Sequence, residues 1–201
     1  SQKALIKCWE TGINHWDTAD VYGDGRSEEV IGSVWDTVQR DKIFLATKVG
    51  WDQGKADHWY NTGIMRHNME RSLKNLNTEC VDLLYFHHCN FGNNGEYFDD
   101  ALETIKRFQE EGKTKFIGLS DWDLNKIMHY IKKADPDVVQ PYRNVWDDNY
   151  ATSGLQKYVE DNHLGVCFFS PLMHGLLTGK YSEPPLFGEG DFRQNVSAFK
   201  N

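Results

Sequence analysis

The sequence predicts an α/β protein built on a parallel sheet, and two observations support this fold class. Short apolar runs alternate strictly with helix-like segments along the chain, and the runs are apolar throughout, as in strands covered on both faces. Each run also ends at a polar or titratable residue. Six such runs can be counted, so we expect about six βα units.

The N-terminal third opens with a helix over residues 3–11 that Gly12 ends. A short strand over 15–18 follows. A second helix is predicted to begin at Ser27, a favourable N-cap residue that precedes two acidic residues in the first turn. The apolar face of this helix is formed by Ile31, Val34, Trp35 and Val38.

The middle of the chain continues the alternation. Two segments, 63–77 and 98–111, carry apolar residues at helical spacing, and Gly112 ends the second of these helices. Apolar strands precede and follow the helices, at 42–49, 81–87 and 115–119.

The last third contains shorter elements. Asp123 is predicted to cap one helix, and Ser153 is predicted to cap another that runs to about residue 162. Strands are expected at 138–140 and 165–169. From Ser182 onward, Gly, Pro and polar residues predominate without a clear period, so no regular element is predicted there.

Bulk properties exclude several classes of function. The 201 residues fit one domain with a sizeable core, and the formal net charge of −8 disfavours a nucleic-acid partner. No apolar run approaches a membrane span. The four cysteines are irregularly spaced without a CxxC pair, which indicates a reducing, cytoplasmic location.

The strand ends form a series of polar residues. Tyr22 lies in the loop after the first strand, and a lysine and a histidine each directly end an apolar strand. One such residue could be a solvated strand end, but in a parallel barrel all of them meet around one mouth. The series therefore predicts one site; its strand-end members are Asp17, Lys48, His87, Ser120 with Asp121, Gln140 and Ser170.

Three other motifs favour structural roles. Residues 23–28 resemble the start of a dinucleotide-binding GxGxxG, but Glu28 replaces the last glycine. His88 and Cys89 follow His87, yet adjacent strand residues point to opposite faces and no further ligand is suitably spaced, so no metal site is expected. Three tryptophans are expected to serve packing: Trp9, Trp35 and Trp122.

Several segments occur in a characteristic order: residues 12–23 with Gly25 and Ser27-Glu28, Thr47-Lys48-Val49, Val81-Asp82-Leu83 closing on His87, residues 117–120, Val139-Gln140, Ser170-Pro171-Leu172 and residues 175–181. Together they closely resemble the aldo-keto reductase family from residue 12 to residue 181. The resemblance implies a (β/α)8 TIM-type barrel that reduces an aldehyde or ketone to an alcohol with NADPH.

The resemblance also implies a catalytic tetrad of Asp17, Tyr22, Lys48 and His87. Hydride arriving at a carbonyl carbon leaves an alkoxide that needs a proton, which Tyr22 would donate. A free tyrosine is too weak an acid for this, but a neighbouring Lys48 ammonium favours the phenolate. Asp17 would hold the lysine, and His87 would donate a hydrogen bond to the carbonyl oxygen.

Cofactor and substrate contacts follow from the same resemblance. It assigns Ser120, Asp121 and Gln140 to the nicotinamide carboxamide and Phe169 to the nicotinamide ring. Ser170 and Leu172 would meet the pyrophosphate, and Trp51 would line the substrate pocket. Asp121 departs from the usual Asn and cannot donate a hydrogen bond as a carboxylate, so weaker nicotinamide binding is expected. Phe169 stands where Tyr is common.

The extent of the chain departs further from the family. Residues 1–201 are expected to form a single, partial barrel domain without the family's first strand and last βα unit. Two open edges should result, to be covered by a second copy or by segments outside this chain. The missing part normally binds the adenosine 2′-phosphate, so NADH stays open beside NADPH. The alternative function is a weakly active or inactive module, similar to potassium-channel β subunits.

Overall fold

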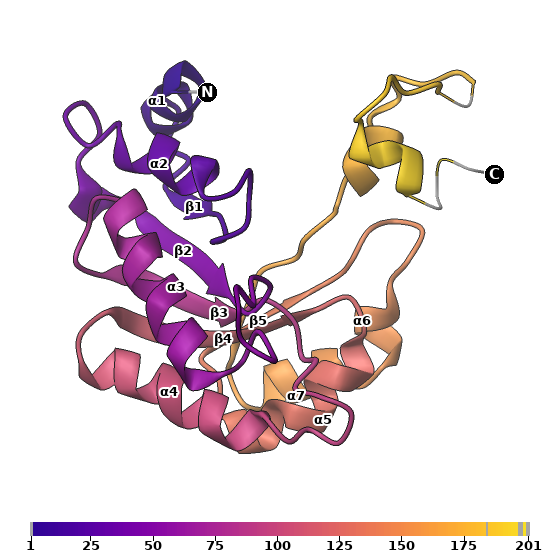
Figure 1. The fold of residues 1–201 in the computed structure, drawn as a ribbon. Coiled ribbons are helices and arrows are strands. Elements are labelled where there is room, and N and C mark those ends of the chain that lie inside the picture. The colour runs from indigo at the N-terminus through magenta and orange to yellow at the C-terminus, as the bar shows by residue number, and fades with distance from the viewer. Residues whose placement is uncertain (1, 184, 197–198, 200–201) are drawn as a thin grey trace.

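The computed structural model describes residues 2–183, 185–196 and 199. Six parallel strands form one sheet in chain order, so that each strand pairs with its neighbours in the sequence. The sheet curls into a half-barrel (Figure 1), which confirms the predicted incomplete barrel. Its strands are β1 (His15–Asp17), β2 (Phe44–Val49), β3 (Val81–Phe86), β4 (Thr114–Asp121), β5 (Val138–Pro141) and β6 (Gly165–Val166).

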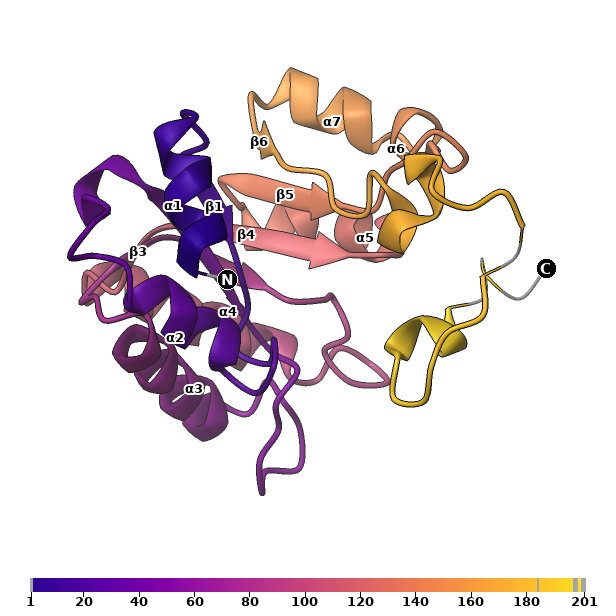
Figure 2. The ribbon, with the colours of Figure 1, turned by 90° about the horizontal axis from the view of Figure 1, so that it is seen from above.

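Helices cover the outer side of the curved sheet (Figure 2). They are α1 (Gln2–Glu10), α2 (Arg26–Gly32), α3 (Thr62–Asn75), α4 (Phe98–Glu110), α5 (Leu124–Ala134), α6 (Asn149–Thr152) and α7 (Leu155–Asp161). Short 3-10 turns are η1 (Arg40–Lys42), η2 (Met173–Thr178) and η3 (Phe192–Asn195). Among the described helices, none has the length and apolar character that a membrane crossing requires.

The two faces of the sheet have different roles. On the outer face, residues such as Leu45 and Leu84 join the large core that packs against the helices. The alternate positions point into the half-barrel, where Ala46, Leu83 and Tyr85 form a smaller apolar cluster. Side chains alternate along a strand, so the polar residues at the carboxyl ends of these strands, two positions after the cluster, also face inward. They lie at one end of the inner face.

The start of α2 differs from the prediction. Ser27 is not the N-cap, because Gly25 occupies that position with a left-handed φ of 83° and the helix begins at Arg26. The hydroxyl of Ser27 instead accepts a hydrogen bond of 2.8 Å from Thr18. The helix also ends at Gly32, so the predicted helical face was wrong beyond Ile31, although Val34 and Val38 are buried in the core.

The last third of the chain also differs from the prediction. The predicted strand 165–169 is only two residues long, and beyond it a single bridge joins Tyr142 to Phe169. Gly154, not Ser153, caps α7, although the Ser153 hydroxyl accepts a bond from the Leu155 amide. The tail from Ser182 contains one short turn, η3, and its residues 184, 197–198 and 200–201 lie outside the described part.

Both sheet edges are open in the described part of the chain, as expected: β1 pairs only with β2, and β6 only with β5. Beside β1, a hollow of about 660 Å³ lies between α1 and α2 and reaches Asp17 and Tyr22. The lining of this hollow includes Leu5, Ile13 and Val30. The C-terminal segment extends away from the sheet (Figure 1).

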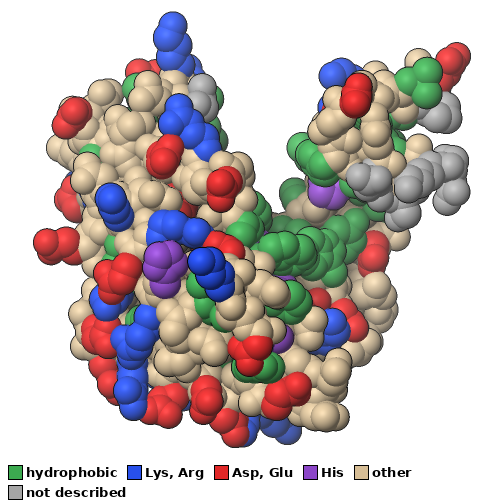
Figure 3. Space-filling model, viewed as in Figure 1, with side chains coloured by type: hydrophobic (Ala, Val, Ile, Leu, Met, Phe, Trp, Pro, Cys, Tyr) green, Lys and Arg blue, Asp and Glu red, His purple; other side chains and the backbone are tan. Residues whose placement is uncertain are grey.

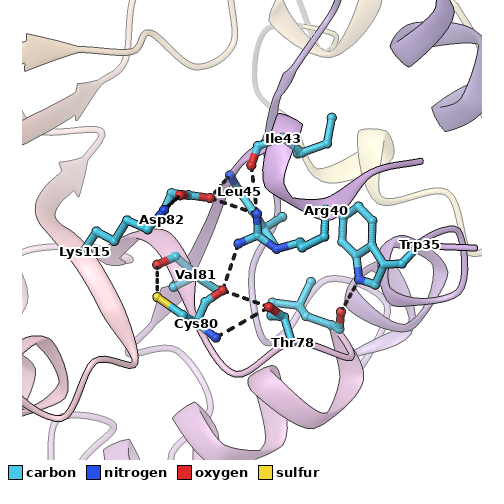
Figure 4. Close-up of polar contacts among 10 residues, drawn as sticks. Trp35, Arg40, Ile43, Leu45, Thr78, Cys80, Val81, Asp82 and Lys115 are labelled. Carbon is cyan, nitrogen blue, oxygen red and sulfur yellow. Dashed lines mark hydrogen bonds and ion pairs between the residues drawn. The ribbon is translucent and has the colours of Figure 1, made fainter.

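Asp82 joins the starts of three strands at the opposite end from the polar strand ends (Figure 4). Its carboxylate accepts hydrogen bonds from the Leu45 amide at 2.9 Å and from Arg40 at 3.0 Å. Lys115 donates to it at 2.6 Å. Arg40 also donates to the carbonyls of Ile43 and Cys80. These bonds fix β2, β3 and β4 relative to one another.

Candidate active site

Lys48 lies at the centre of the polar strand ends. It is 2% exposed, and its ammonium forms an ion pair with Asp17 and donates to the carbonyl of Thr18 at 2.7 Å. The other carboxylate oxygen of Asp17 accepts a bond of 2.9 Å from the Gln140 amide. Asp17 is therefore held by side chains from both β2 and β5, across the mouth of the half-barrel.

Tyr22 reaches this ion pair from the loop between β1 and α2. The Lys48 ammonium lies 5.1 Å from the centre of the Tyr22 ring. The His87 ring contacts the Tyr22 ring edge-on, with centroids 5.6 Å apart. The half-barrel thus brings together all four residues of the expected tetrad, and Tyr22 is 42% exposed.

His87 follows β3 and is 6% exposed. Burial lowers its pKa to about 3, and the neighbouring charges of Lys48 and His88 act in the same direction. The imidazole is therefore neutral at physiological pH and carries one N–H donor. Within the described residues, its Nδ1 atom has no hydrogen-bond partner.

Ser120 and Gln140 are register partners on β4 and β5 and are 4% and 5% exposed. They lie side by side on the inner face of the sheet, near the carboxyl ends of the two strands. Asp121 is the next residue on β4, and its two oxygens accept main-chain bonds of 2.7 Å from Cys89 and Asp123. Asp121 thereby links β4 to the loop after β3.

The remaining cofactor candidates lie beyond β6. Phe169 is half-buried, and its ring meets the edges of Trp122 at 5.3 Å and Tyr142 at 5.4 Å. Ser170 follows with a left-handed φ of 58°, and Leu172 is 55% exposed. A half-buried aromatic ring among other aromatic rings can accommodate a planar ring such as a nicotinamide.

Aromatic side chains line the mouth. Trp51 contacts the His87 ring at 5.3 Å and the Trp122 ring at 5.9 Å. Trp122 is 50% exposed, so its packing against Trp51 and Phe169 lies at the mouth and not in the core. Its place directly after Ser120 and Asp121 could have indicated the mouth. Hydrophobic side chains gather in the hollow between the N-terminal helices and the C-terminal segment (Figure 3).

The burial of two acids, Asp20 in the loop after β1 and Glu28 in α2, was not predicted. Asp20 is fully buried, and neither of its oxygens has a hydrogen-bond partner in the described part. Burial, reinforced by the charge of Glu28, raises the pKa of Asp20 to about 7. Glu28 accepts bonds from Thr47 at 2.7 Å and Asn75 at 3.3 Å, which ties α2 to β2 and α3. The contacts of Glu28 with β2 and α3 are tertiary contacts that local sequence does not show.

The fold and the grouped strand ends agree with a comparison against protein families. The family model described as "Aldo/keto reductase family" matches residues 1–199. The chain belongs to the aldo-keto reductase family.

Individual relatives are similar over nearly the whole chain. It is 30% identical to aldo-keto reductase yakc [NADP(+)] of Schizosaccharomyces pombe, over 100% of this chain and 60% of that protein. It is 28% identical to a "probable voltage-gated potassium channel subunit beta" of Oryza sativa subsp. japonica, over 99% of this chain and 62% of that one.

Among solved structures, the glycerol dehydrogenase AKR11B4 from Gluconobacter oxydans aligns with a TM-score of 0.82 and 26% identity. The alignment covers 98% of this chain and 61% of that one. The chain thus spans about 60% of the length of the curated relatives it matches.

Proposed function

We propose that this chain forms the catalytic face of a carbonyl reductase that converts an aldehyde or ketone to an alcohol. The observation that supports this most strongly is the arrangement of Lys48, which is ion-paired to Asp17 and lies over the Tyr22 ring. A buried, neutral His87, whose ring contacts the Tyr22 ring edge-on, completes the set. This combination supplies a proton donor, a charge that assists it and a donor for the carbonyl oxygen.

NADPH, when bound, would supply the hydride that the carbonyl carbon accepts. Tyr22 donates its hydroxyl proton to the carbonyl oxygen as the alcohol forms. The Lys48 ammonium stabilises the resulting phenolate, and Asp17 keeps the ammonium in place. The neutral His87 ring donates a hydrogen bond to the same oxygen and orients the substrate.

Ser120 and Gln140 are the residues we assign to the nicotinamide carboxamide, because their side chains lie side by side at the inner end of β4 and β5. The Gln140 nitrogen is used by Asp17, which leaves its oxygen free to accept from the amide. Asp121 retains lone pairs beyond its two main-chain bonds and can accept from the same amide nitrogen.

Phe169 would stack on the nicotinamide ring, and Ser170 and Leu172 would meet the pyrophosphate region. The name of the yakc relative includes NADP(+), which supports NADPH over NADH. Trp51 would contact the substrate, because its half-exposed ring lies against His87.

The test is a coupled measurement on the 201-residue chain. NADPH binding is followed by fluorescence, and its oxidation is followed by absorbance after addition of a panel of aldehydes and ketones. We expect binding and carbonyl-dependent oxidation, with the alcohol identified as product. Binding without oxidation of NADPH by any carbonyl compound would contradict the proposed activity.

The second candidate is a regulatory module with little turnover. The similarity to a potassium-channel subunit beta favours it. In this case the chain would bind the nicotinamide cofactor and a protein partner or second copy along its open edges. Slow or absent turnover, with cofactor binding intact, distinguishes this candidate from the reductase.

A further inference from the structure

Tyr60 lies in the loop between β2 and α3 and is fully buried. Its hydroxyl donates a short hydrogen bond to the carbonyl of His88 and accepts one from the His88 amide at 3.3 Å. One phenol therefore binds both main-chain polar groups of the residue next to His87. Tyr60 contributes nothing to the chemistry proposed above.

The imidazole of His87 has few other restraints. Its Nδ1 atom has no hydrogen-bond partner in the described ranges, and the ring is in contact with the rings of Tyr22 and Trp51. The His87 amide donates to the Val49 carbonyl at 2.9 Å. The placement of the ring thus depends on how firmly the main chain at residues 87–88 is held.

The contact between Tyr60 and Gly50 fixes the phenol itself. Gly50 has a φ of 110°, and a Cβ atom there would lie 2.1 Å from Tyr60 Cε1. On another side the Tyr60 ring stacks on Phe91, with centroids 4.5 Å apart. Tyr60 is therefore held between Gly50, which follows β2, and Phe91, which lies in the loop after β3.

We propose that Tyr60 is a positioning residue for His87, whose hydroxyl fixes the main chain at His88 and so aims the imidazole at the substrate carbonyl. This inference rests on the proposed reductase function. Groups that orient a catalytic side chain without touching the substrate act through small displacements, which are costly because the reacting geometry is demanding.

The test compares Tyr60→Phe with Tyr97→Phe. Tyr97 donates to Asp57, which lies in the same loop as Tyr60, at 3.0 Å. The Tyr97→Phe variant therefore also removes one phenolic hydroxyl that contacts this loop, but it leaves the hydrogen bonds at His88 in place. We expect Tyr60→Phe to lower kcat about tenfold, while the KM for the carbonyl and the Kd for NADPH change less than about twofold. Tyr97→Phe should leave all three constants unchanged.

A second readout does not depend on activity. The pH titration of the His87 ring resonances is recorded by NMR in the wild-type chain and in both variants. The ring should titrate far below 6.5 in wild type and in Tyr97→Phe. In Tyr60→Phe the resonances should shift and the apparent pKa should rise, because the released ring gains access to water.

The possible outcomes separate the two proposals. An inactive wild type refutes the reductase function, while the NMR comparison still tests Tyr60. Unchanged kcat together with unchanged His87 resonances in Tyr60→Phe overturns the positioning role. So does an equal loss of kcat and of NADPH affinity, which would indicate general damage.

If Tyr60→Phe does not fold, Gly50→Ala takes its place. The added Cβ atom should displace the Tyr60 ring, while Tyr60 keeps its hydroxyl. The same fall in kcat and the same change in the His87 titration are expected. Wild-type behaviour of a folded Gly50→Ala in both measurements would also overturn the proposal.

Discussion

The Lys48 ammonium lies 5.1 Å from the centre of the Tyr22 ring. Lys48 belongs to β2, the strand that pairs with β1. Asp17 balances the lysine charge and Gln140 holds Asp17 from β5. A cation kept beside a phenol in this way is useful when the phenol must lose its proton.

Tyr22→Phe should lower kcat by roughly 10²–10⁴-fold, because the proton donor is lost while the ring remains. The Kd for NADPH should stay close to that of wild type. Steady-state kinetics and fluorescence titration measure the two effects. Tyr158→Phe on α7, which removes a hydroxyl from a residue outside the site, serves as the control. Near-normal turnover of Tyr22→Phe would show that the role is misassigned.

Asp121→Asn should destabilise the fold. Both oxygens of Asp121 accept main-chain N–H bonds, and an amide NH2 group would face one of these donors. The free energy of unfolding should fall by about 1–3 kcal/mol, as for a buried donor left without an acceptor. Urea denaturation measures this.

Asp123→Asn is the matched control for this variant. Asp123 caps α5 by accepting from the Asn125 amide at 3.0 Å, and Asn caps a helix about as well as Asp. Its stability should stay near that of wild type. Equal stability of Asp121→Asn and wild type would mean that the two main-chain bonds do not contribute.

Asp20 should make stability depend on pH. Its pKa is raised in the folded state from 3.8 to about 7, so its contribution is fully present below pH 3.8 and is lost as the pH rises through 7. Relative to wild type, Asp20→Asn should therefore gain stability between pH 4 and pH 8, by on the order of 4 kcal/mol.

The comparison of Asp20→Asn with wild type isolates the contribution of Asp20 to the pH dependence of stability. The lowered pKa values of His87 and His88 act in the opposite direction, since they favour the folded state as the pH rises towards 6.5. Both proteins contain these histidines, so their contribution cancels. Denaturation at several pH values measures the difference in the free energy of unfolding between Asp20→Asn and wild type. A difference that does not change with pH would show that Asp20 does not titrate in this range.

Asp82→Asn should weaken the junction at the strand starts shown in Figure 4. The variant loses the charge that Arg40 and Lys115 contact, and stability should fall by about 2 kcal/mol. Asp41→Asn is the control, because the Asp41–Lys42 pair is exposed and its loss should have little effect. Similar melting temperatures for the two variants would contradict a structural role for Asp82.

Much of the architecture could be read from local sequence. Apolar runs and helical spacing are local properties, and they determined the order of strands and helices together with the strand ends at Asp17, Lys48 and His87. A parallel sheet must bring such ends to one edge. The resemblance to the family suggested the proposed roles of these residues, and it groups Tyr22 with them.

Tertiary structure alone decided the contacts that hold the site. Gln140 meets Asp17 across 123 residues of sequence, and Tyr60 binds the main chain of His88, because the curvature of the sheet brings distant loops together. The same applies to Glu28, which Asn75 of α3 contacts. Such contacts depend on how elements pack rather than on propensity or periodicity, so no local pattern in the sequence marks them.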